Sequence, residues 1–130
     1  MRIVTRPDFD GVVCALLLRE AINDKLPIFW AEPGDMQQGL IDVRAGDIVA
    51  NLPFHDRCAM WFDHHYSNVP GRPFEGAVEL APSAAGLVYR YFADRLTTDL
   101  EVLRRETDWV GGGGRCGEGV ALRGGWRGGR

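Results

Sequence analysis

Two short strings hold the carboxylate and imidazole groups of this chain that are best placed to bind a metal ion. Asp8-Phe9-Asp10-Gly11 follows the hydrophobic run 2–5, and Asp63-His64-His65 follows the run 59–62. If these runs form parallel strands that lie side by side, their carboxyl ends meet at one edge of a sheet, where ligand sites gather. Carboxylates and imidazoles that converge there would suit a pair of hard divalent cations.

Each string also has a plainer structural explanation. Asp8 and Asp10 are two residues apart, so on an extended segment their side chains point the same way, and Gly11 lets the backbone approach a ligand closely. Asp10 could instead be the N-cap of a helix that begins at Gly11. His64 and His65 could be ordinary polar loop residues. Because both strings follow a strand-like run in a chain with three histidines, we favour the metal site.

Strand-like and helix-like patterns alternate along the chain. The runs 2–5, 27–31, 47–52 and 59–62 predict strands, and residues 66–75 predict a loop. Helices are predicted over 11–23, which is apolar nearly all round and should be buried, and as a short turn over 35–41. Two more are predicted from Pro82 to about Leu96, capped by Ser83, and after a Thr98 or Asp99 cap. The alternation predicts an α/β fold with a parallel sheet covered by helices on both faces.

Composition restricts the class of protein. At 130 residues and 45% hydrophobic content, the chain is long enough for one compact domain with a core. A net charge of −3 argues against a nonspecific nucleic-acid coat and against a membrane-surface protein. No signal-peptide pattern is visible, and the longest apolar run is too short to span a bilayer. Three cysteines without C-x-x-C spacing fit a reducing compartment, so we expect a cytoplasmic protein.

Residues 111–130 differ from the rest of the chain, because ten of these twenty residues are glycine. Burial cannot offset the backbone entropy of such a segment, so we expect it to be disordered or extended. Sparse arginine and few aromatic residues disfavour a Gly/Arg nucleic-acid tail, and a flexible linker would connect to no further domain. We favour a change of reading frame near Val110, since shifted frames of GC-rich DNA encode Gly and Arg in excess.

The pattern RPDFDG at residues 6–11, followed about fifty residues later by WFDHH at 61–65, resembles the DHH phosphoesterases, which are named for that triplet. This superfamily includes single-strand exonucleases, oligoribonucleases, cyclic-dinucleotide phosphodiesterases, family II pyrophosphatases and exopolyphosphatases. The resemblance covers about residues 1–109 and includes the small-residue helix start APSAAG at 81–86. The stretches 32–35 and 51–55 look most like exopolyphosphatase-related members. Residues 1–110 are therefore expected to form the N-terminal, DHH-type domain.

The resemblance implies a two-metal centre that holds manganese or magnesium at the sheet edge. The two cations would clamp a phosphate, and a bridging water would attack phosphorus. His65 would bind metal or the substrate phosphate, and Asp63 would support or join the cluster. The residues in catalytic positions are Asp63, His64 and His65, and those in metal-binding positions are Asp8, Asp10, Asn51, Asp63, His64 and Asp108, the last expected after the final helix.

Three departures from the family pattern bear on activity. Arg6 stands where members usually carry His or Asp; it cannot ligate a cation, but it could hold a phosphate. Asn51 replaces the aspartate of the second motif, which removes one negative charge, and His55 is a candidate substitute ligand or an ordinary loop histidine. The resemblance also stops before the second, substrate-gripping domain of the family.

Two functions therefore remain open. The first is a metal-dependent phosphoesterase domain that hydrolyses a phosphodiester or phosphoanhydride in polyphosphate, an oligonucleotide, a dinucleotide or another phosphorylated small molecule. The second is a truncated or degenerate relative that binds metal or nucleotide without turnover. Neither function implies stable binding to duplex nucleic acid or to a membrane, and a homodimer is left open.

Overall fold

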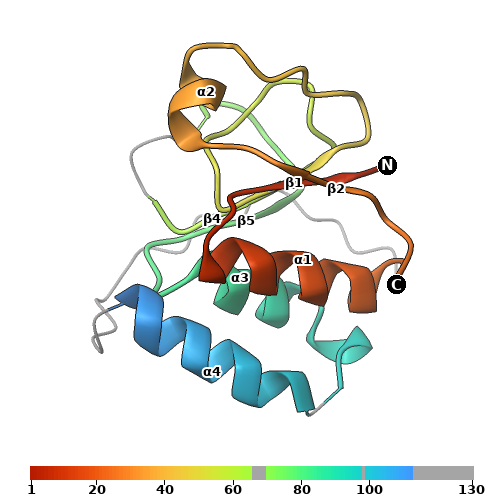
Figure 1. Ribbon diagram of the computed structural model, residues 1–130, viewed down its shortest axis with the longest axis vertical. Coiled ribbons are helices and arrows are strands. Elements are labelled where there is room, and N and C mark those ends of the chain that lie inside the picture. The colour runs from red at the N-terminus through yellow and green to blue at the C-terminus, as the bar shows by residue number, and fades with distance from the viewer. Residues whose placement is uncertain (66–69, 98, 113–130) are drawn as a thin grey trace.

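The computed structural model describes residues 1–65, 70–97 and 99–112, which form a parallel sheet with helices packed against it (Figure 1). The five strands lie in the order β2-β1-β3-β4-β5, and every neighbouring pair is parallel. They are β1 (Ile3–Thr5), β2 (Ile28–Trp30), β3 (Ile48–Ala50), β4 (Met60–Asp63) and β5 (Gly76–Val78). The predicted α/β class, a parallel sheet flanked by helices, is confirmed.

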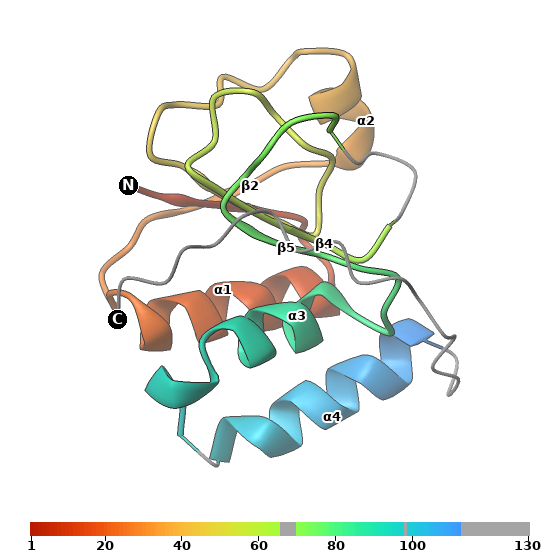
Figure 2. The same cartoon turned by 180° about the vertical axis from the view of Figure 1, so that it is seen from behind.

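The longer helices lie on one side of the sheet. Figures 1 and 2 show α1 (Phe9–Ala21) and α3 (Ala84–Tyr91) against the sheet, with α4 (Asp99–Gly112) packed outside them. A single 3₁₀ turn, Ala93–Arg95, connects α3 to α4. Within the described residues, the opposite side carries the short helix α2 (Pro33–Gln37) together with loops. Helices therefore do cover both sides, but very unequally.

The sheet separates two hydrophobic cores because successive side chains along each strand point to opposite faces. Ile48 and Ala50 of β3 face the core beneath the long helices, whereas Val49 faces the core beneath α2 and the loops. In β4, Phe62 faces the core beneath the long helices and Trp61 faces the core beneath α2. The Trp61 indole N–H donates to the Leu52 carbonyl at 2.8 Å. Burial on both faces explains why β1, β3 and β4 read as unbroken apolar runs.

The sequence pattern did not predict β5. Its first residue, Gly76, has a φ of 125°, and a Cβ at that position would lie 1.9 Å from the Trp61 carbonyl oxygen. Glycine is therefore required there, yet it lowers strand propensity. The two motif-bearing strands are parallel as expected, but they are not neighbours, because β3 lies between β1 and β4. Asn51, which follows β3, consequently sits between the two motifs.

Two predicted helices differ from the observed ones. The first was expected to be buried all round, but Phe9, Val12 and Leu16 of α1 are exposed along one side of the helix. The helix predicted from Pro82 to Leu96 ends at Tyr91, so α3 is shorter. For α1, the apolar pattern was wider than the surface that the sheet and the neighbouring helices cover. After α3, Phe92 is still buried, but the chain continues as the 3₁₀ turn Ala93–Arg95, none of whose residues is buried.

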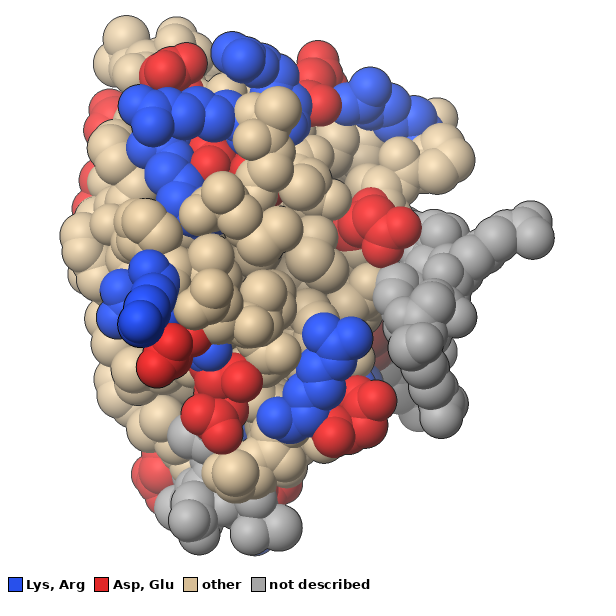
Figure 3. Space-filling model, turned by 90° about the vertical axis from the view of Figure 1, so that its right-hand side faces the viewer, with Lys and Arg blue, Asp and Glu red and all other residues tan. Residues whose placement is uncertain are grey.

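Three further expectations concern the surface charge, a membrane-spanning helix and the glycine-rich segment 111–130. On the face shown in Figure 3, Lys and Arg side chains lie next to Asp and Glu side chains, so charges of both signs are mixed. Among the described residues, no helix combines the length and apolar character needed to cross a bilayer. Gly111 and Gly112 belong to α4, so the expected disordered tail was wrong for these two residues. Residues 113–130 lie outside the described part of the chain.

Candidate metal centre

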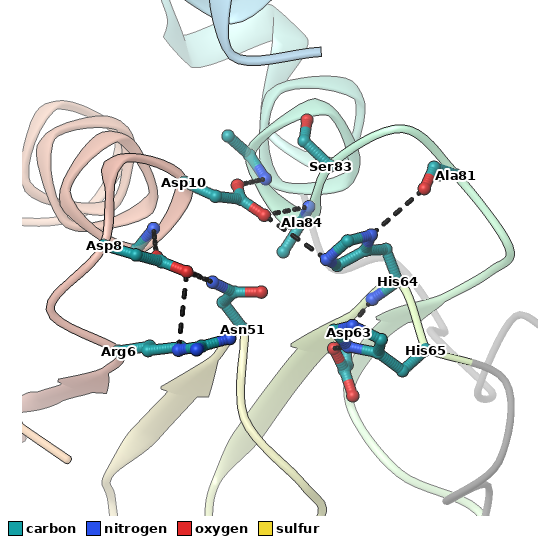
Figure 4. A network of polar contacts seen from close by, with 12 residues as sticks. Arg6, Asp8, Asp10, Asn51, Asp63, His64, His65, Ala81, Ser83 and Ala84 are labelled. Atoms are coloured by element: carbon teal, nitrogen blue, oxygen red, sulfur yellow. Dashed lines mark hydrogen bonds and ion pairs between the residues drawn. The ribbon is translucent and has the colours of Figure 1, made fainter. Parts of the chain in front are cut away.

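The motif residues gather at the carboxyl-terminal edge of the sheet, where β1, β3 and β4 end (Figure 4). Asp8 follows β1, Asn51 follows β3 directly, and Asp63 is the last residue of β4. The Asn51 amide N–H donates to Asp8, and His64 Nε2 lies 3.5 Å from Asp10 Oδ2. The two strings that lie some fifty residues apart in the sequence thus come together at one place, with Asn51 between them.

Asp8, not Asp10, is the N-cap of α1. The Asp8 carboxylate accepts a hydrogen bond from the Gly11 backbone N–H at 2.7 Å. Asp10 already lies inside the first turn of the helix, so the two aspartates do not share one face of an extended segment. The sequence had suggested either that Asp8 and Asp10 lie on one face of an extended segment or that Asp10 caps the helix. Both predictions were wrong, because Asp8 is the cap and Asp10 is helical.

Asp10 is held at the N-terminus of α3. Its two carboxylate oxygens accept the backbone N–H groups of Ala84 at 2.9 Å and Ala85 at 2.8 Å. A helix N-terminus stabilises negative charge in this way. Burial raises the pKa of the Asp10 carboxyl, and the two N–H groups oppose that rise. Asp10 is thus a rigidly placed, buried acid whose environment only partly compensates its charge.

Asp63, His64 and His65 form the cluster whose ligand atoms lie within 4.8 Å of one another. Asp63 is buried, and its Oδ1 accepts the His64 backbone N–H at 2.9 Å and pairs with His65 Nδ1 at 2.9 Å. This hydrogen bond raises the pKa of the His65 imidazole above its ordinary value. Asp63 therefore fixes the His65 ring and the His64 backbone while contributing a negative charge of its own.

The His64 ring is oriented so that one nitrogen faces Asp10. Its Nδ1 lies 3.1 Å from the Ala81 carbonyl oxygen, an acceptor, so a neutral ring carries its proton on Nδ1. The lone pair is then on Nε2, which lies 3.5 Å from Asp10 Oδ2. Either a proton on Nε2 or a bound cation would make this contact between two acceptors favourable. A backbone carbonyl that fixes the ring is typical of metal-binding histidines.

Asn51 supplies a third acceptor. Its Nδ2 donates to both oxygens of Asp8, at 3.0 and 3.3 Å, which fixes the orientation of the amide. Its Oδ1 is buried and has no hydrogen-bond partner among the described residues. Figure 4 shows this oxygen directed away from Asp8, toward the space beside His64. An unsatisfied buried acceptor costs about 1–3 kcal/mol, so a cation at this place would fit the residues present.

The backbone at Asn51 is also unusual, with a φ of 57°. The left-handed region is uncommon for residues other than glycine, although asparagine tolerates it better than most. Strained backbone of this kind clusters at functional sites. With this backbone conformation, the Asn51 side chain lies at the edge of the sheet, between Asp8 and His64 (Figure 4).

Arg6 lies at the rim of the site. Its Nε is 3.5 Å from Asp8 Oδ2 and 3.7 Å from Glu32 Oε2, and its side chain is 42% exposed. The turn between Arg6 and α1 is tight, because a Cβ on Gly11 would lie 1.8 Å from the Arg6 carbonyl oxygen. The close approach that requires glycine is therefore to the chain itself, and not to a ligand as the motif had suggested.

Asp108 was expected after the last helix but lies within α4. Its carboxylate accepts the Ser83 hydroxyl and pairs with Arg104 Nη1 at 2.6 Å. Within the described residues, no hydrogen bond or ion pair joins Asp108 to Asp10 or His64. Its role in a metal site therefore stays a prediction. His55 accepts the Arg57 backbone N–H at 3.1 Å and lies outside the cluster of Asp63 and the two vicinal histidines.

The sequence did not indicate that residues at and just before the start of α3 position the site side chains. The Ala81 carbonyl, the Ser83 side chain and the N–H groups of Ala84 and Ala85 position His64, Asp108 and Asp10. The signal was present in the APSAAG string at 81–86, where small residues allow close approach. A Cβ on Gly86, for example, would lie 2.8 Å from Asp108 Oδ1.

Replacement of Ser83 with alanine tests this support. Ser83 is buried, its Oγ accepts the Gly86 N–H at 3.0 Å, and its hydroxyl donates to Asp108. Loss of this N-cap should lower the free energy of unfolding by about 1–2 kcal/mol, measured by urea denaturation. Thr97→Ala, at an exposed position before α4, is the control and should change stability by less than about 0.5 kcal/mol. Equal effects of the two substitutions would show that Ser83 is not a cap in solution.

Comparison with solved structures shows a similarity to a known enzyme. The pGpG-specific phosphodiesterase PggH from Vibrio cholerae is similar in structure, with a TM-score of 0.69 and 32% sequence identity. The match covers 82% of this chain and 35% of the PggH chain, so this chain spans about a third of the length of that protein. No family model matches the sequence, and no curated protein matches it.

Proposed function

We propose that residues 1–110 form a DHH-type domain that hydrolyses a phosphodiester or phosphoanhydride with the help of a divalent cation, manganese or magnesium. Two independent observations support this proposal. The motif strings at 6–11 and 61–65 resemble those of the DHH phosphoesterases, and the structure is similar to part of a pGpG-specific phosphodiesterase at 32% identity. A dinucleotide such as pGpG is therefore the first substrate to test, before polyphosphate and short oligonucleotides.

The observation that carries the proposal is the set of buried acceptors that face one another. Asp10 Oδ2 faces His64 Nε2 at 3.5 Å, and the unpartnered Asn51 Oδ1 points toward the space beside His64 (Figure 4). Asp63, also buried, belongs with His64 to the cluster whose ligand atoms lie within 4.8 Å of one another. Carboxylate, amide and imidazole groups are ligands for hard divalent cations. A bound cation would lower the pKa of its water and offset charge on the phosphate.

The chain's own residues would bind and orient the substrate. Arg6 is partly exposed at the rim, and its guanidinium can donate two parallel hydrogen bonds to one phosphate. His65 is 55% exposed, and its raised pKa increases the protonated fraction that can donate to a phosphate oxygen. Asp63 would keep His65 in place through the bond to Nδ1. The resemblance implies Asp8, Asp10, Asn51, Asp63, His64 and Asp108 as metal-binding residues, and the buried acceptors of Asp10, Asn51, Asp63 and His64 are the ones that we propose for a cation.

The contacts of Asp8 favour a second candidate function, which is binding of a cation and a nucleotide without turnover. This carboxylate already pairs with Arg6 and accepts the Asn51 amide, so one side of the site is occupied by the chain's own donors. A domain of this kind could hold a cation and a nucleotide but activate water poorly. The two candidates predict the same binding and differ only in turnover.

Hydrolysis of pGpG in manganese, in magnesium and in EDTA separates the two candidates. The phosphoesterase proposal expects GMP to be released in the presence of either cation and not in EDTA, because the residues cannot activate water alone. Binding of pGpG in manganese without release of GMP would favour the non-catalytic candidate. Neither binding nor release with pGpG, a short oligonucleotide or polyphosphate would contradict both.

A further inference from the structure

Asp8 is surrounded by donors and by a positive charge. Its Oδ1 accepts the Gly11 N–H at 2.7 Å and the Asn51 amide at 3.0 Å, and its Oδ2 lies 3.3 Å from the same amide nitrogen. Arg6 Nε is 3.5 Å from that second oxygen. These donors occupy the lone-pair directions of Asp8 that a cation would need. A metal ion there would have to displace Asn51 and lie beside a guanidinium.

Asp10 and Asp63 are in a different situation. In the described part of the chain, neither of them forms an ion pair with Lys or Arg, and the basic side chains that they contact are the rings of His64 and His65. Each Asp10 oxygen accepts one backbone N–H, and Oδ1 also accepts the Cys14 thiol at 3.8 Å, so the further lone pair is on Oδ2, the oxygen that faces His64. His64 and Asn51 Oδ1 add neutral acceptors on the same side. This half of the site fits a cation, whereas the Asp8 half does not.

The charge balance leads to the same conclusion. Asp8 is balanced by Arg6, and Asp63 is hydrogen-bonded to the His65 ring, so the two buried carboxylates of Asp10 and Asp63 supply at most two uncompensated negative charges. One divalent cation balances those two charges. A second divalent cation would leave an excess of positive charge next to Arg6, which is unfavourable in a partly buried site where charges interact strongly.

We infer that the site holds a single divalent cation, on the side of Asp10, Asp63 and His64, and that Arg6 takes the place of a second cation against the substrate phosphate. The inference rests on the proposed function, because it concerns the same site. Figure 4 shows Arg6 and Asp8 on one side of Asn51 and the two histidines on the other. Within the described residues, both ion pairs of Arg6 run through Nε, so its terminal nitrogens remain for a phosphate.

The number of bound manganese ions tests the inference directly. Equilibrium dialysis of the full chain should give one manganese per chain, and its paramagnetic resonance spectrum should be that of an isolated ion and not of an exchange-coupled pair. The double variant Arg6→His, Asn51→Asp should bind a second ion, because it removes the guanidinium and adds a carboxylate at a position where aspartate also tolerates a positive φ. Two ions in the wild type would overturn the inference and leave the proposed function standing. No bound ion would overturn the proposed function itself.

The role of Arg6 is tested with inorganic phosphate as the probe. In the presence of magnesium, Arg6→Ala should weaken phosphate binding in calorimetry about tenfold, as expected for loss of a charge-assisted contact, while one cation remains bound. Arg44→Ala is the matched control, because Arg44 is exposed and precedes β3 at the opposite end of the strands. Equal phosphate affinity in the Arg6 variant and the wild type would overturn the role of Arg6.

Discussion

Replacement of Gly11 with alanine is expected to lower the free energy of unfolding by about 3 kcal/mol, the upper part of the range for overpacked positions. A Cβ at this position would lie 1.8 Å from the Arg6 carbonyl oxygen and 3.0 Å from Thr5 Oγ1. The Arg6 carbonyl is backbone that follows β1 directly, so it cannot move without shifting the strand or the start of α1. The gain in helix propensity from alanine is smaller than this penalty.

Gly34→Ala is the matched control for that substitution. Gly34 also lies in the first turn of a helix, but a Cβ there would meet nothing within 4 Å. Its stability should change by less than about 0.5 kcal/mol, and both variants can be measured by urea denaturation. Equal stability of the two variants would contradict the tight turn between Arg6 and α1. Because this turn sets the positions of Asp8 and Asp10, the Gly11 variant should also lose cation binding.

The sequence predicted the strands that carry the site, and the reason is physical. The strands β1, β3 and β4 are buried on both faces, so they appear as continuous apolar runs that end in polar residues. Residues at the ends of parallel strands meet at one edge, which is why Asp8, Asn51 and His64 could be expected together. The fold class followed from the same alternation of strands and helices.

Other features depend on contacts that no local pattern contains. The three-residue strand β5 begins at a glycine and follows a loop rich in Pro and Gly, so its propensity is low, and only pairing with β4 makes it a strand. The hydrogen bonds from Ala84 and Ala85 to Asp10 span more than seventy residues of sequence. The order of the strands, with β3 between the two motifs, is likewise a property of the whole sheet.

The charge state of the site was the least predictable part. The sequence indicated that Asn51 removes a carboxylate, but it could not indicate that the Asn51 amide pairs with Asp8 while its oxygen stays buried without a partner. That arrangement depends on the positive φ of Asn51 and on the position of Arg6 beside Asp8. It is this pairing that divides the site into a half that fits a cation and a half that does not.

Binding of manganese to the native state should stabilise the fold strongly. A ligand present at a hundred times its dissociation constant stabilises by about 2.7 kcal/mol if it binds only the folded chain. For a chain of this size, that stabilisation corresponds to a rise in Tm of roughly 10 °C. The effect should be lost in His64→Ala and in Asp10→Ala, because each substitution removes one of the facing acceptors. Magnesium should give the same pattern if the oxygen ligands dominate.

The most direct test of the metal centre is therefore the difference in Tm with and without manganese, measured for each variant against its own metal-free state. This difference cancels any loss of stability that a substitution causes by itself. The metal centre proposed here predicts a large rise for the wild type and for the control His55→Ala, whose imidazole lies outside the cluster, and no rise for His64→Ala or Asp10→Ala. An equal rise in all four proteins would contradict it and would mean that these carboxylate and imidazole groups are structural alone.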